Sequence, residues 1–314
     1  MTKEKQNSGV VVRSTGSWYE VRTDEGLVLS CRFKGKFKIA GIKSTNPIAV
    51  GDRVTFIKDG EENGVIDSIL PRRNYIIRKS TKLSKQTHII ATNIDYAFLV
   101  VTISQPRTSS GFIDRFLLTA ALYHIPVVLV FNKVDLNKEK ENEIQNEFLE
   151  LYQTIGYQCL VTSATRGDGI DELKAMMKGR TSMFGGHSGV GKSALVNAIQ
   201  PGIELKTSEI SSVHQKGRHT TTFAEMHPLE FNGYIIDTPG IKEFGVVNLE
   251  KQDVAGYFPE MEFFMHDCKY NNCLHVREPQ CAVKEAVENG EIAESRYINY
   301  LAIILDEEFD KKPF

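Results

Sequence analysis

The stretch Gly186-His187-Ser188-Gly189-Val190-Gly191-Lys192-Ser193 decides the fold, because it has the pattern G-x-x-x-x-G-K-S of a phosphate-binding P-loop. An apolar run at 181–184 precedes it and a helix-like segment at 192–199 follows it, which is the context that a P-loop requires. Its glycines let backbone N–H groups turn around phosphate oxygens, and the N-terminus of the next helix adds partial positive charge. We expect Lys192 to reach the β- and γ-phosphates, Ser193 to bind Mg²⁺, and Ala194 to complete the nucleotide-binding loop.

The chain on both sides of this loop alternates between strand and helix patterns. Apolar runs predict strands at 94–103, 126–131, 158–162 and 181–184. Helical patterns are expected at 112–123, 139–155, 169–177 and 192–199. This alternation predicts an α/β domain in which helices cover both faces of a parallel sheet. Two further strands, 222–229 and 233–237, are expected to form a hairpin that turns at Asn232-Gly233.

A second motif, Asn132-Lys133-Val134-Asp135, directly follows the predicted strand 126–131. N-K-x-D is a pattern that reads guanine. The Asp135 carboxylate accepts from both N1–H and the exocyclic amine of guanine, a bidentate pair that adenine cannot form. Asn132 is expected to bond the N7 atom and to tie this loop to the P-loop, while Lys133 lays its apolar stem along the base.

The loop Thr162-Ser163-Ala164-Thr165 also follows a predicted strand, and we expect N–H groups of Ser163 and Ala164 to meet guanine O6. The turn and helix start at 167–173 directly behind it strengthen this interpretation. An ATP-using P-loop enzyme is a weaker alternative, because Asn132 and Asp135 favour guanine.

The tetrapeptide Asp237-Thr238-Pro239-Gly240 ends the last predicted strand. There Asp237 is expected to face Mg²⁺ and Gly240 to present its N–H to the γ-phosphate. In most GTPases the P-loop comes first in the chain, whereas here both base-reading loops precede it. A parallel sheet accepts such a permutation if the old ends lie close together. The segment after Gly240, which should respond to the γ-phosphate, then runs directly into the C-terminal region.

The N-terminal region lacks the alternating strand and helix patterns of the predicted α/β domain. It contains about five short strand patterns separated by Gly- and Asp-containing turns. We expect a small barrel of the oligonucleotide-binding (OB) type, with an SH3-like barrel as the alternative, then a basic linker at 78–85. Residues 1–90 carry 17 basic and 9 acidic side chains, against 21 and 31 in residues 91–314, which indicates a polyanionic partner for the barrel. Arg32, Lys34, Lys36 and Lys38 would share one strand face, and Trp18 is assigned to the core.

Composition excludes several classes of protein. Hydrophobic residues make up 41% and charged residues 25% of the chain, which excludes a wholly disordered chain, a collagen-like fibre and a simple coiled coil. The apolar runs are too short for a membrane helix, and the N-terminus lacks the apolar core of a secretory signal. We therefore expect a cytoplasmic protein without membrane contact. Separately, we expect the protein to act as a monomer.

The C-terminal region contains the cluster Cys268-x₄-Cys273-x-His275-x₅-Cys281. Three thiolates and one imidazole suit tetrahedral Zn²⁺, and four protein ligands leave no open position, so we predict one structural zinc ion. Cys31 and Cys159 lie in apolar strand-like settings and are expected to be small buried hydrophobes. Helices are expected at 279–288 and 292–309.

The chain resembles the circularly permuted GTPases, and more narrowly the ribosome small-subunit-dependent GTPase A family of bacteria. The resemblance rests on the motif order, the run Gly217-Arg218-His219-Thr220-Thr221-Thr222 and the metal cluster. It implies an RNA-binding barrel at 1–78, a permuted GTPase domain at 79–246 and a zinc-binding helical domain at 247–314. It further implies hydrolysis of GTP to GDP and phosphate during late maturation of the small (30S) ribosomal subunit, stimulated by the subunit, with the barrel on ribosomal RNA.

The candidate residues for hydrolysis come from the run 217–222 and from the position after Gly240. Thr222 is our choice for the switch threonine that binds Mg²⁺. Ile241 stands where Ras-like proteins carry a water-positioning glutamine, so we expect slow unaided turnover. His219 is the candidate for the catalytic position. For the protein as a whole, the alternative to a GTP-hydrolysing enzyme is a nucleotide-regulated RNA-binding chaperone with negligible turnover.

Overall fold

The computed structural model describes residues 7–33, 47–79, 87–203, 224–237 and 249–305. His219, Thr222 and Gly240 lie outside these ranges, as do Ile241 and the lysines between 34 and 38. The chain forms two compact units. Unit 1 comprises residues 1–98, 170–185 and 192–243, and unit 2 comprises residues 99–169, 186–191 and 244–314. The division at 78 and 246 into three domains stays a prediction.

Five strands of unit 1 close into a barrel: β1 (Asn7–Ser14), β2 (Tyr19–Thr23), β3 (Val28–Phe33), β4 (Arg53–Asp59) and β5 (Asn63–Ile69). Strand β1 pairs antiparallel with both β2 and β4, β2 with β3, and β4 with β5, whereas β3 and β5 run parallel. This confirms the expected OB-like barrel. Its core is formed by alternate apolar residues, namely Val11, Tyr19, Val21, Leu29, Cys31, Ile48, Val54, Phe56 and Ile66.

The barrel is followed by a hairpin that the sequence reading missed. Strands β6 (Tyr75–Lys79) and β7 (Thr87–Thr92) pair antiparallel, so the expected linker at 78–85 begins inside a strand. The basic residues at 78–85 hid the β-branched runs at 76–77 and 89–90, which supply the strand preference.

A buried carboxylate, Asp52, joins the barrel to Arg72 and to the strand β7. Asp52 is fully buried, and Arg72 donates Nε and Nη2 to its two oxygens at 2.6 Å each. Thr92 Oγ1 at the end of β7 donates to the same carboxylate at 2.9 Å, and the Ala49 N–H donates at 2.8 Å. We call Asp52, Arg72 and Thr92 the barrel joint.

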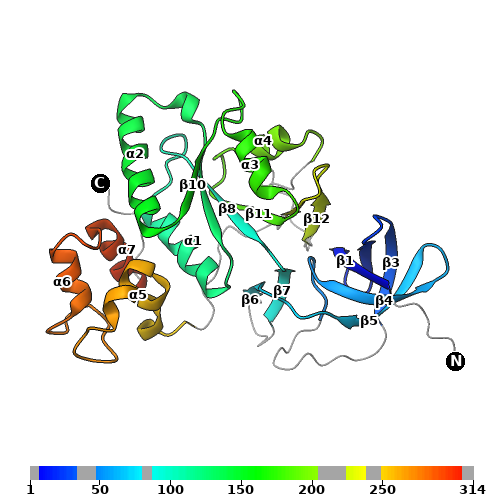
Figure 1. Ribbon diagram of the computed structural model, residues 1–314, viewed down its shortest axis with the longest axis horizontal. Coiled ribbons are helices and arrows are strands. Elements are labelled where there is room, and N and C mark those ends of the chain that lie inside the picture. Colours follow the sequence, from blue (N-terminus) through cyan, green and yellow to red (C-terminus); the bar gives the residue numbers. More distant parts are fainter. Residues whose placement is uncertain (1–6, 34–46, 80–86, 204–223, 238–248, 306–314) are drawn as a thin grey trace, which may run out of the picture. The chain divides into compact units, whose positions relative to one another are not determined.

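The rest of unit 1 consists of strands and helices of the α/β region (Figure 1). Strands β11 (Thr181–Gly185) and β13 (Tyr234–Asp237) run parallel, and β12 (Glu225–Pro228) pairs antiparallel with β13 as the expected hairpin. Asn232 takes a positive φ of 62° at its turn, and a Cβ on Gly233 would lie 2.6 Å from the Met177 carbonyl oxygen. Helix α3 (Ile170–Met177) packs against α4 (Lys192–Ile199).

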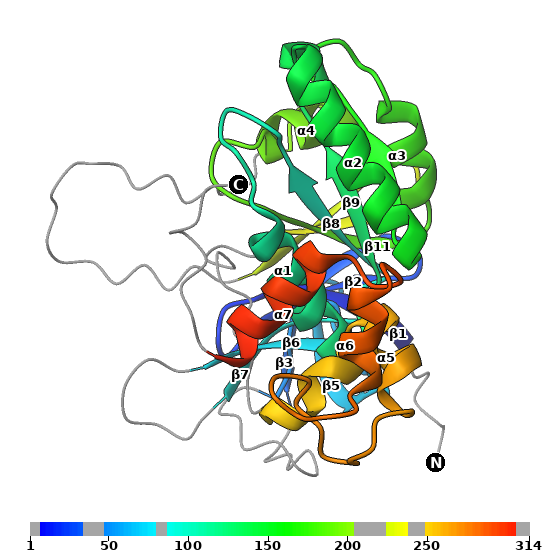
Figure 2. The same ribbon diagram turned by 90° about the vertical axis from the view of Figure 1, so that its left-hand side faces the viewer.

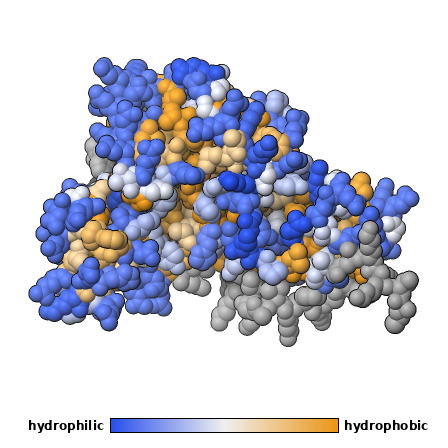
Figure 3. Space-filling view, in the orientation of Figure 1, coloured by the Kyte–Doolittle hydropathy of each residue, from blue (hydrophilic) through white to orange (hydrophobic). Residues whose placement is uncertain are grey.

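Unit 2 holds the other strands and helices of the α/β region. Strand β8 (Tyr96–Val101) ends here, and β9 (Val127–Phe131) runs parallel to β10 (Gln158–Val161). Helix α1 (Ser110–Leu122) begins at the N-cap Ser109, whose side chain accepts from the Phe112 N–H. Helix α2 (Glu139–Ile155) buries few side chains, and the surface over it is mostly hydrophilic (Figure 3).

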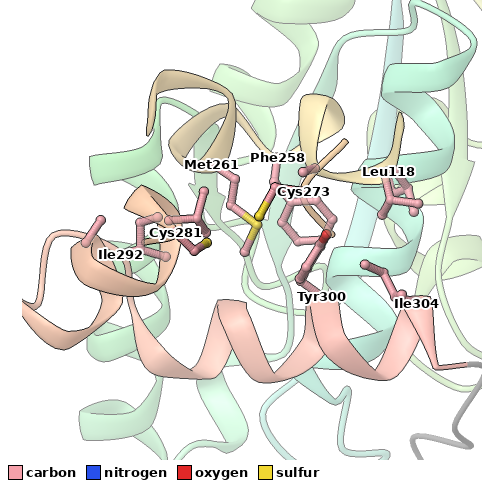
Figure 4. Packing of buried hydrophobic residues seen from close by; sticks show 12 residues of the cluster. Leu118, Phe258, Met261, Cys273, Cys281, Ile292, Tyr300 and Ile304 are labelled. Atoms are coloured by element: carbon pink, nitrogen blue, oxygen red, sulfur yellow. The ribbon is translucent and has the colours of Figure 1, made fainter. Parts of the chain in front are cut away.

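The C-terminal module of unit 2 consists of η2 (Lys251–Tyr257), α5 (Pro259–Met265), α6 (Ala282–Glu288) and α7 (Glu294–Ile304). Helix α7 lies alongside α1 (Figure 2). Tyr300 and Ile304 of α7 pack in a core that also includes Leu118 of α1 (Figure 4). The module therefore completes its apolar core on a helix of the α/β region. Among the described residues, no helix is long and apolar enough to cross a membrane.

A second buried ion pair fastens this module to α1. Arg296 of α7 is 1% exposed and donates Nη1 to Asp114 of α1 at 2.5 Å and Nε to Glu260 of α5 at 2.5 Å. Tyr152 and Asn299 donate to the same aspartate at 2.7 and 2.6 Å. Burial raises the pKa of Asp114, and Arg296 opposes that rise. We call these five residues the C-terminal joint.

Candidate nucleotide-binding and metal sites

Asn132 connects the three loops from which the sequence predicted a guanine nucleotide site. It follows β9 and is 3% exposed. Its backbone N–H donates a hydrogen bond of 2.8 Å to the Val101 carbonyl oxygen, which positions the residue. Its Nδ2 donates to the Val190 carbonyl in the P-loop at 2.9 Å, and its Oδ1 accepts from Thr162 Oγ1 at 3.1 Å. The predicted tie between the base-reading loop and the P-loop is therefore present.

Two P-loop glycines are required by close approaches. Gly191 has φ +97°, and a Cβ there would lie 2.4 Å from Asn132 Nδ2. Gly186 has φ +128°, and a Cβ there would lie 2.5 Å from the Val100 carbonyl oxygen. Any larger residue would push the P-loop away from the base-reading loop or from β8.

The Asp135 carboxylate is held by two hydroxyls. Ser163 Oγ donates to Oδ1 at 2.6 Å, and Thr165 Oγ1 donates to Oδ2 at 3.0 Å. The hydrogen bond from Ser163 is the main reason why the pKa of Asp135 is lowered. Thr165 was not among the predicted site residues, although its hydroxyl, two residues after Ser163, was a visible signal.

Lys133 and Val134 complete the base-reading loop. Lys133 takes a left-handed conformation at φ 64°, and its Nζ donates to the Gln105 carbonyl oxygen at 2.7 Å. Val134 begins the short helix η1 (Val134–Leu136), and its N–H faces the Thr162 carbonyl at 3.4 Å. Ala164, next to Ser163, is half-buried.

The structure describes some of the residues that are expected to bind the phosphates and Mg²⁺. Lys192, Ser193 and Ala194 form the first turn of α4, and Asp237 ends β13. Met183 and Ile236 are partners in the parallel ladder, so Asp237 ends its strand level with the end of β11. In the P-loop itself Val190 is buried, whereas His187, Ser188 and Gly189 are exposed. The His187 ring packs 3.8 Å from the Phe112 ring between centroids.

The four predicted metal ligands lie together. The ligand atoms of Cys268, Cys273, His275 and Cys281 are all within 4.8 Å of one another. His275 Nδ1 lies 3.3 Å from Cys281 Sγ and 3.6 Å from Cys268 Sγ, and those two sulfurs are 3.9 Å apart. Tetrahedral bonds of about 2.3 Å to sulfur and about 2.0 Å to nitrogen separate neighbouring ligands by roughly 3.5 to 3.8 Å. The cluster therefore fits a metal ion.

Glu278 organises the backbone between these ligands and was missed in the sequence. Its carboxylate accepts N–H groups of Leu274 at 3.0 Å, Val276 at 2.9 Å and Arg277 at 3.0 Å. Burial raises the pKa of Glu278, but these backbone donors outweigh that effect and bring the pKa to about 2. Tyr297 also donates to the His275 carbonyl at 2.6 Å.

The remaining sequence assignments have mixed outcomes. Cys31 is buried as expected and Cys159 is half-buried, and burial raises the pKa of each thiol to about 11. The assignment of Trp18 to the core was wrong, because its side chain is 41% exposed and the Arg32 guanidinium lies 4.8 Å over its ring. Tyr19, the next residue, points into the barrel instead, since neighbours on a strand face opposite ways.

Comparisons with known proteins agree with this geometry. The model of the RsgA GTPase family matches residues 69–247, and that of the RsgA N-terminal domain matches residues 8–66. The small ribosomal subunit biogenesis GTPase RsgA of Christiangramia forsetii is 55% identical over 303 residues, covering 96% of each chain. The protein of the same name from Bacteroides fragilis is 52% identical, covering 96% of this chain and 98% of the relative.

Two solved structures have the same fold over nearly the whole chain. YjeQ from Thermotoga maritima has a TM-score of 0.80 at 38% identity, covering 96% of this chain and 98% of the other. YloQ, described as a circularly permuted GTPase, has a TM-score of 0.77 at 28% identity, covering 100% and 99%. The protein is therefore a GTP hydrolase with a permuted GTPase domain, and its chain belongs to the RsgA GTPase family.

Proposed function

We propose that this chain acts in the late maturation of the small (30S) ribosomal subunit, hydrolysing GTP to GDP and phosphate while bound to the subunit. The names of the relatives support the ribosomal role. The observation that carries the nucleotide part is the Asn132 side chain, which bonds the Val190 carbonyl in the P-loop and accepts from Thr162. One amide thereby joins the loop that reads the base to the loop that wraps the phosphates.

In this proposal the base-reading residues recognise guanine and the P-loop holds the phosphates. Asp135 accepts from the base, and Lys192 neutralises phosphate charge. Ser193, Asp237 and Thr222 are the residues that would hold Mg²⁺, which when bound neutralises charge on the β- and γ-phosphates. The complete nucleotide-binding set is Asn132, Lys133, Val134, Asp135, Ser163, Ala164, Gly186, His187, Ser188, Gly189, Val190, Gly191, Lys192, Ser193, Ala194, Asp237 and Gly240.

Turnover without a partner should be slow, because the residue after Gly240 is Ile241, which cannot hydrogen-bond a water. We propose His219 as the residue that acts on the attacking water. Replacing His219 by Ala should abolish subunit-stimulated hydrolysis while leaving GDP binding intact. Unchanged stimulated hydrolysis in that variant would remove His219 from the mechanism.

In this proposal the N-terminal barrel binds RNA, and the metal cluster keeps the C-terminal module folded. The exposed Trp18 ring with Arg32 above it offers a stacking surface beside positive charge, which suits ribosomal RNA. The metal cluster is proposed to hold one structural Zn²⁺, since three thiolates and one imidazole match that ion. The protein would work as a cytoplasmic monomer with three domains, 1–78, 79–246 and 247–314.

One experiment tests the ribosomal role. GTP hydrolysis is measured with purified small subunits, with large subunits and with neither. We expect strong acceleration by small subunits alone. The alternative, an RNA-binding chaperone with negligible turnover, predicts no acceleration, and the family to which the chain belongs does not favour it.

A further inference from the structure

The loop after β10 presents two hydroxyls to one carboxylate. Ser163 Oγ donates to Oδ1 of Asp135 at 2.6 Å, and Thr165 Oγ1 donates to Oδ2 at 3.0 Å. With one donor on each oxygen, rotation of the carboxylate about its Cβ–Cγ bond breaks at least one hydrogen bond. An ionised carboxylate accepts about four hydrogen bonds, so about two acceptor positions remain for the base.

The two hydroxyls are attached differently. Ser163 is fully buried, its N–H donates to the Asp168 carbonyl at 3.0 Å, and its Oγ also accepts from the Arg166 N–H at 3.2 Å. Ser163 is therefore part of the turn itself. Thr165 is exposed, and its hydroxyl lies 3.0 Å from Ser163 Oγ as well as from Asp135. A change at Thr165 removes a donor to the carboxylate without opening the buried turn.

We propose that Thr165 is a positioning residue for guanine recognition, holding the second oxygen of Asp135 in the plane where it meets the base. This inference rests on the proposed binding of guanine at Asp135. Guanine offers two donors on one edge, N1–H and the exocyclic amine, and both are met only when the two carboxylate oxygens lie in the plane of the base. Hypoxanthine has the N1–H and lacks the amine, so it needs only one oxygen.

IDP is the nucleoside diphosphate that carries hypoxanthine in place of guanine. The preference of the protein for GDP over IDP therefore reports on the orientation of the Asp135 carboxylate. If Thr165 had a purely structural role, its substitution would weaken the binding of GDP and IDP equally and leave the ratio of their affinities unchanged. A positioning role lowers the GDP affinity more than the IDP affinity. Because a hydrogen bond to a charged group is at stake, we expect the GDP-to-IDP preference to fall roughly tenfold.

The test uses the full-length protein and competition binding with GDP, IDP and ADP. Thr165→Val keeps the shape of the side chain and removes the hydroxyl, Thr165→Ala is a second variant without it, and Thr165→Ser restores it. We expect both hydroxyl-free variants to lose most of the GDP-to-IDP preference and Thr165→Ser to retain it. Arg166→Gln is the matched control, because Arg166 pairs with Asp168 at 2.6 Å and acts on Asp135 only through its charge.

The outcomes separate this inference from the function on which it rests. If the wild-type protein prefers GDP to ADP but Thr165→Val and Thr165→Ala keep the wild-type GDP-to-IDP ratio, the positioning role is overturned and the guanine site stands. If Thr165→Ser behaves like Thr165→Val, the hydroxyl is not the cause and the inference fails. A wild-type protein that does not prefer GDP to ADP would overturn the guanine site and the inference together.

Discussion

The barrel and the C-terminal module are both fastened by a buried arginine–aspartate pair, yet their apolar cores differ. The barrel core is drawn from β1 to β5 and Ile48. The core of the C-terminal module includes Leu118, a residue of α1. The barrel joint thus attaches a structure with a core of its own, whereas the C-terminal joint belongs to a core that spans the module and α1.

The two ion pairs also differ in their surroundings. Arg72 is 9% exposed, and Asp52 keeps two further donors, the Ala49 N–H and the Thr92 hydroxyl. Arg296 is 1% exposed and serves two carboxylates, Asp114 and Glu260. Burial lowers the pKa of Arg296, but these carboxylates outweigh that effect and raise it, so this guanidinium stays charged. Loss of Arg296 would leave more buried charge uncompensated than loss of Arg72.

Metal removal should give the largest effect and should touch only one of the two regions. Metal binding to such small clusters contributes on the order of 10 kcal/mol to folding. We expect a strong chelator to abolish hydrogen-exchange protection across residues 268–281 and to leave the barrel strands protected. Exchange measured by mass spectrometry before and after chelation is the readout. Equal loss of protection in the barrel would show that the two regions are not independent.

Replacing Arg296 by Met should destabilise the C-terminal module by about 3–5 kcal/mol, because the buried Asp114 and the half-buried Glu260 both lose their cation. The measurement is hydrogen exchange of α1 and α7, with Arg277→Met, an exposed position on the metal loop, as the control. Protection of α1 equal to that of wild type would mean that α1 does not depend on the joint.

Replacing Arg72 by Met should cost less, roughly 1.5–3 kcal/mol, since Asp52 retains its bonds from Ala49 and Thr92. The change should appear as faster exchange at the Thr92 N–H, which bonds the Val50 carbonyl at 2.9 Å, while the barrel core stays protected. Collapse of the whole barrel in this variant would contradict the view that its core is self-sufficient.

The smallest effect is expected at an exposed pair in the barrel. Arg53 bonds Asp24 at 2.8 Å, and both side chains are about half exposed (48% and 55%). Solvent and salt weaken such a pair, so Arg53→Gln should change the free energy of unfolding by less than about 1 kcal/mol. Thermal unfolding of this variant beside Arg72→Met gives the comparison, and a larger loss in Arg53→Gln would reverse the proposed order.

The sequence predicted most of the α/β region because its signals are local. The bounds of α2 were predicted to the residue, the P-loop and the base-reading loop are short continuous motifs, and the metal ligands all come from the one segment 268–281. Asn132 could also be expected to reach the P-loop, since the sequence predicts a strand of a parallel sheet directly before each motif, and the hydrogen bond to Val190 is present.

The missed features depend on contacts between distant residues. Arg296 in a helix pattern reads as an exposed residue, and its partner Asp114 is 182 positions away. Trp18 could not be assigned to a face without the register of β2, and the contact of Thr165 with Asp135, on which its proposed role rests, depends on the fold of the loop. Glu278 was hidden for a similar reason, because a carboxylate that binds three backbone N–H groups leaves no spacing pattern.

The closure of the barrel protects the protein from one route of self-association. Each of the five strands pairs with a neighbour on both sides, because β4 returns to β1. A sheet with a free border can recruit a strand from another molecule and grow into an aggregate. The ring offers no such border along its paired residues, so the barrel can expose its outer side chains to a partner without recruiting a strand from a second molecule.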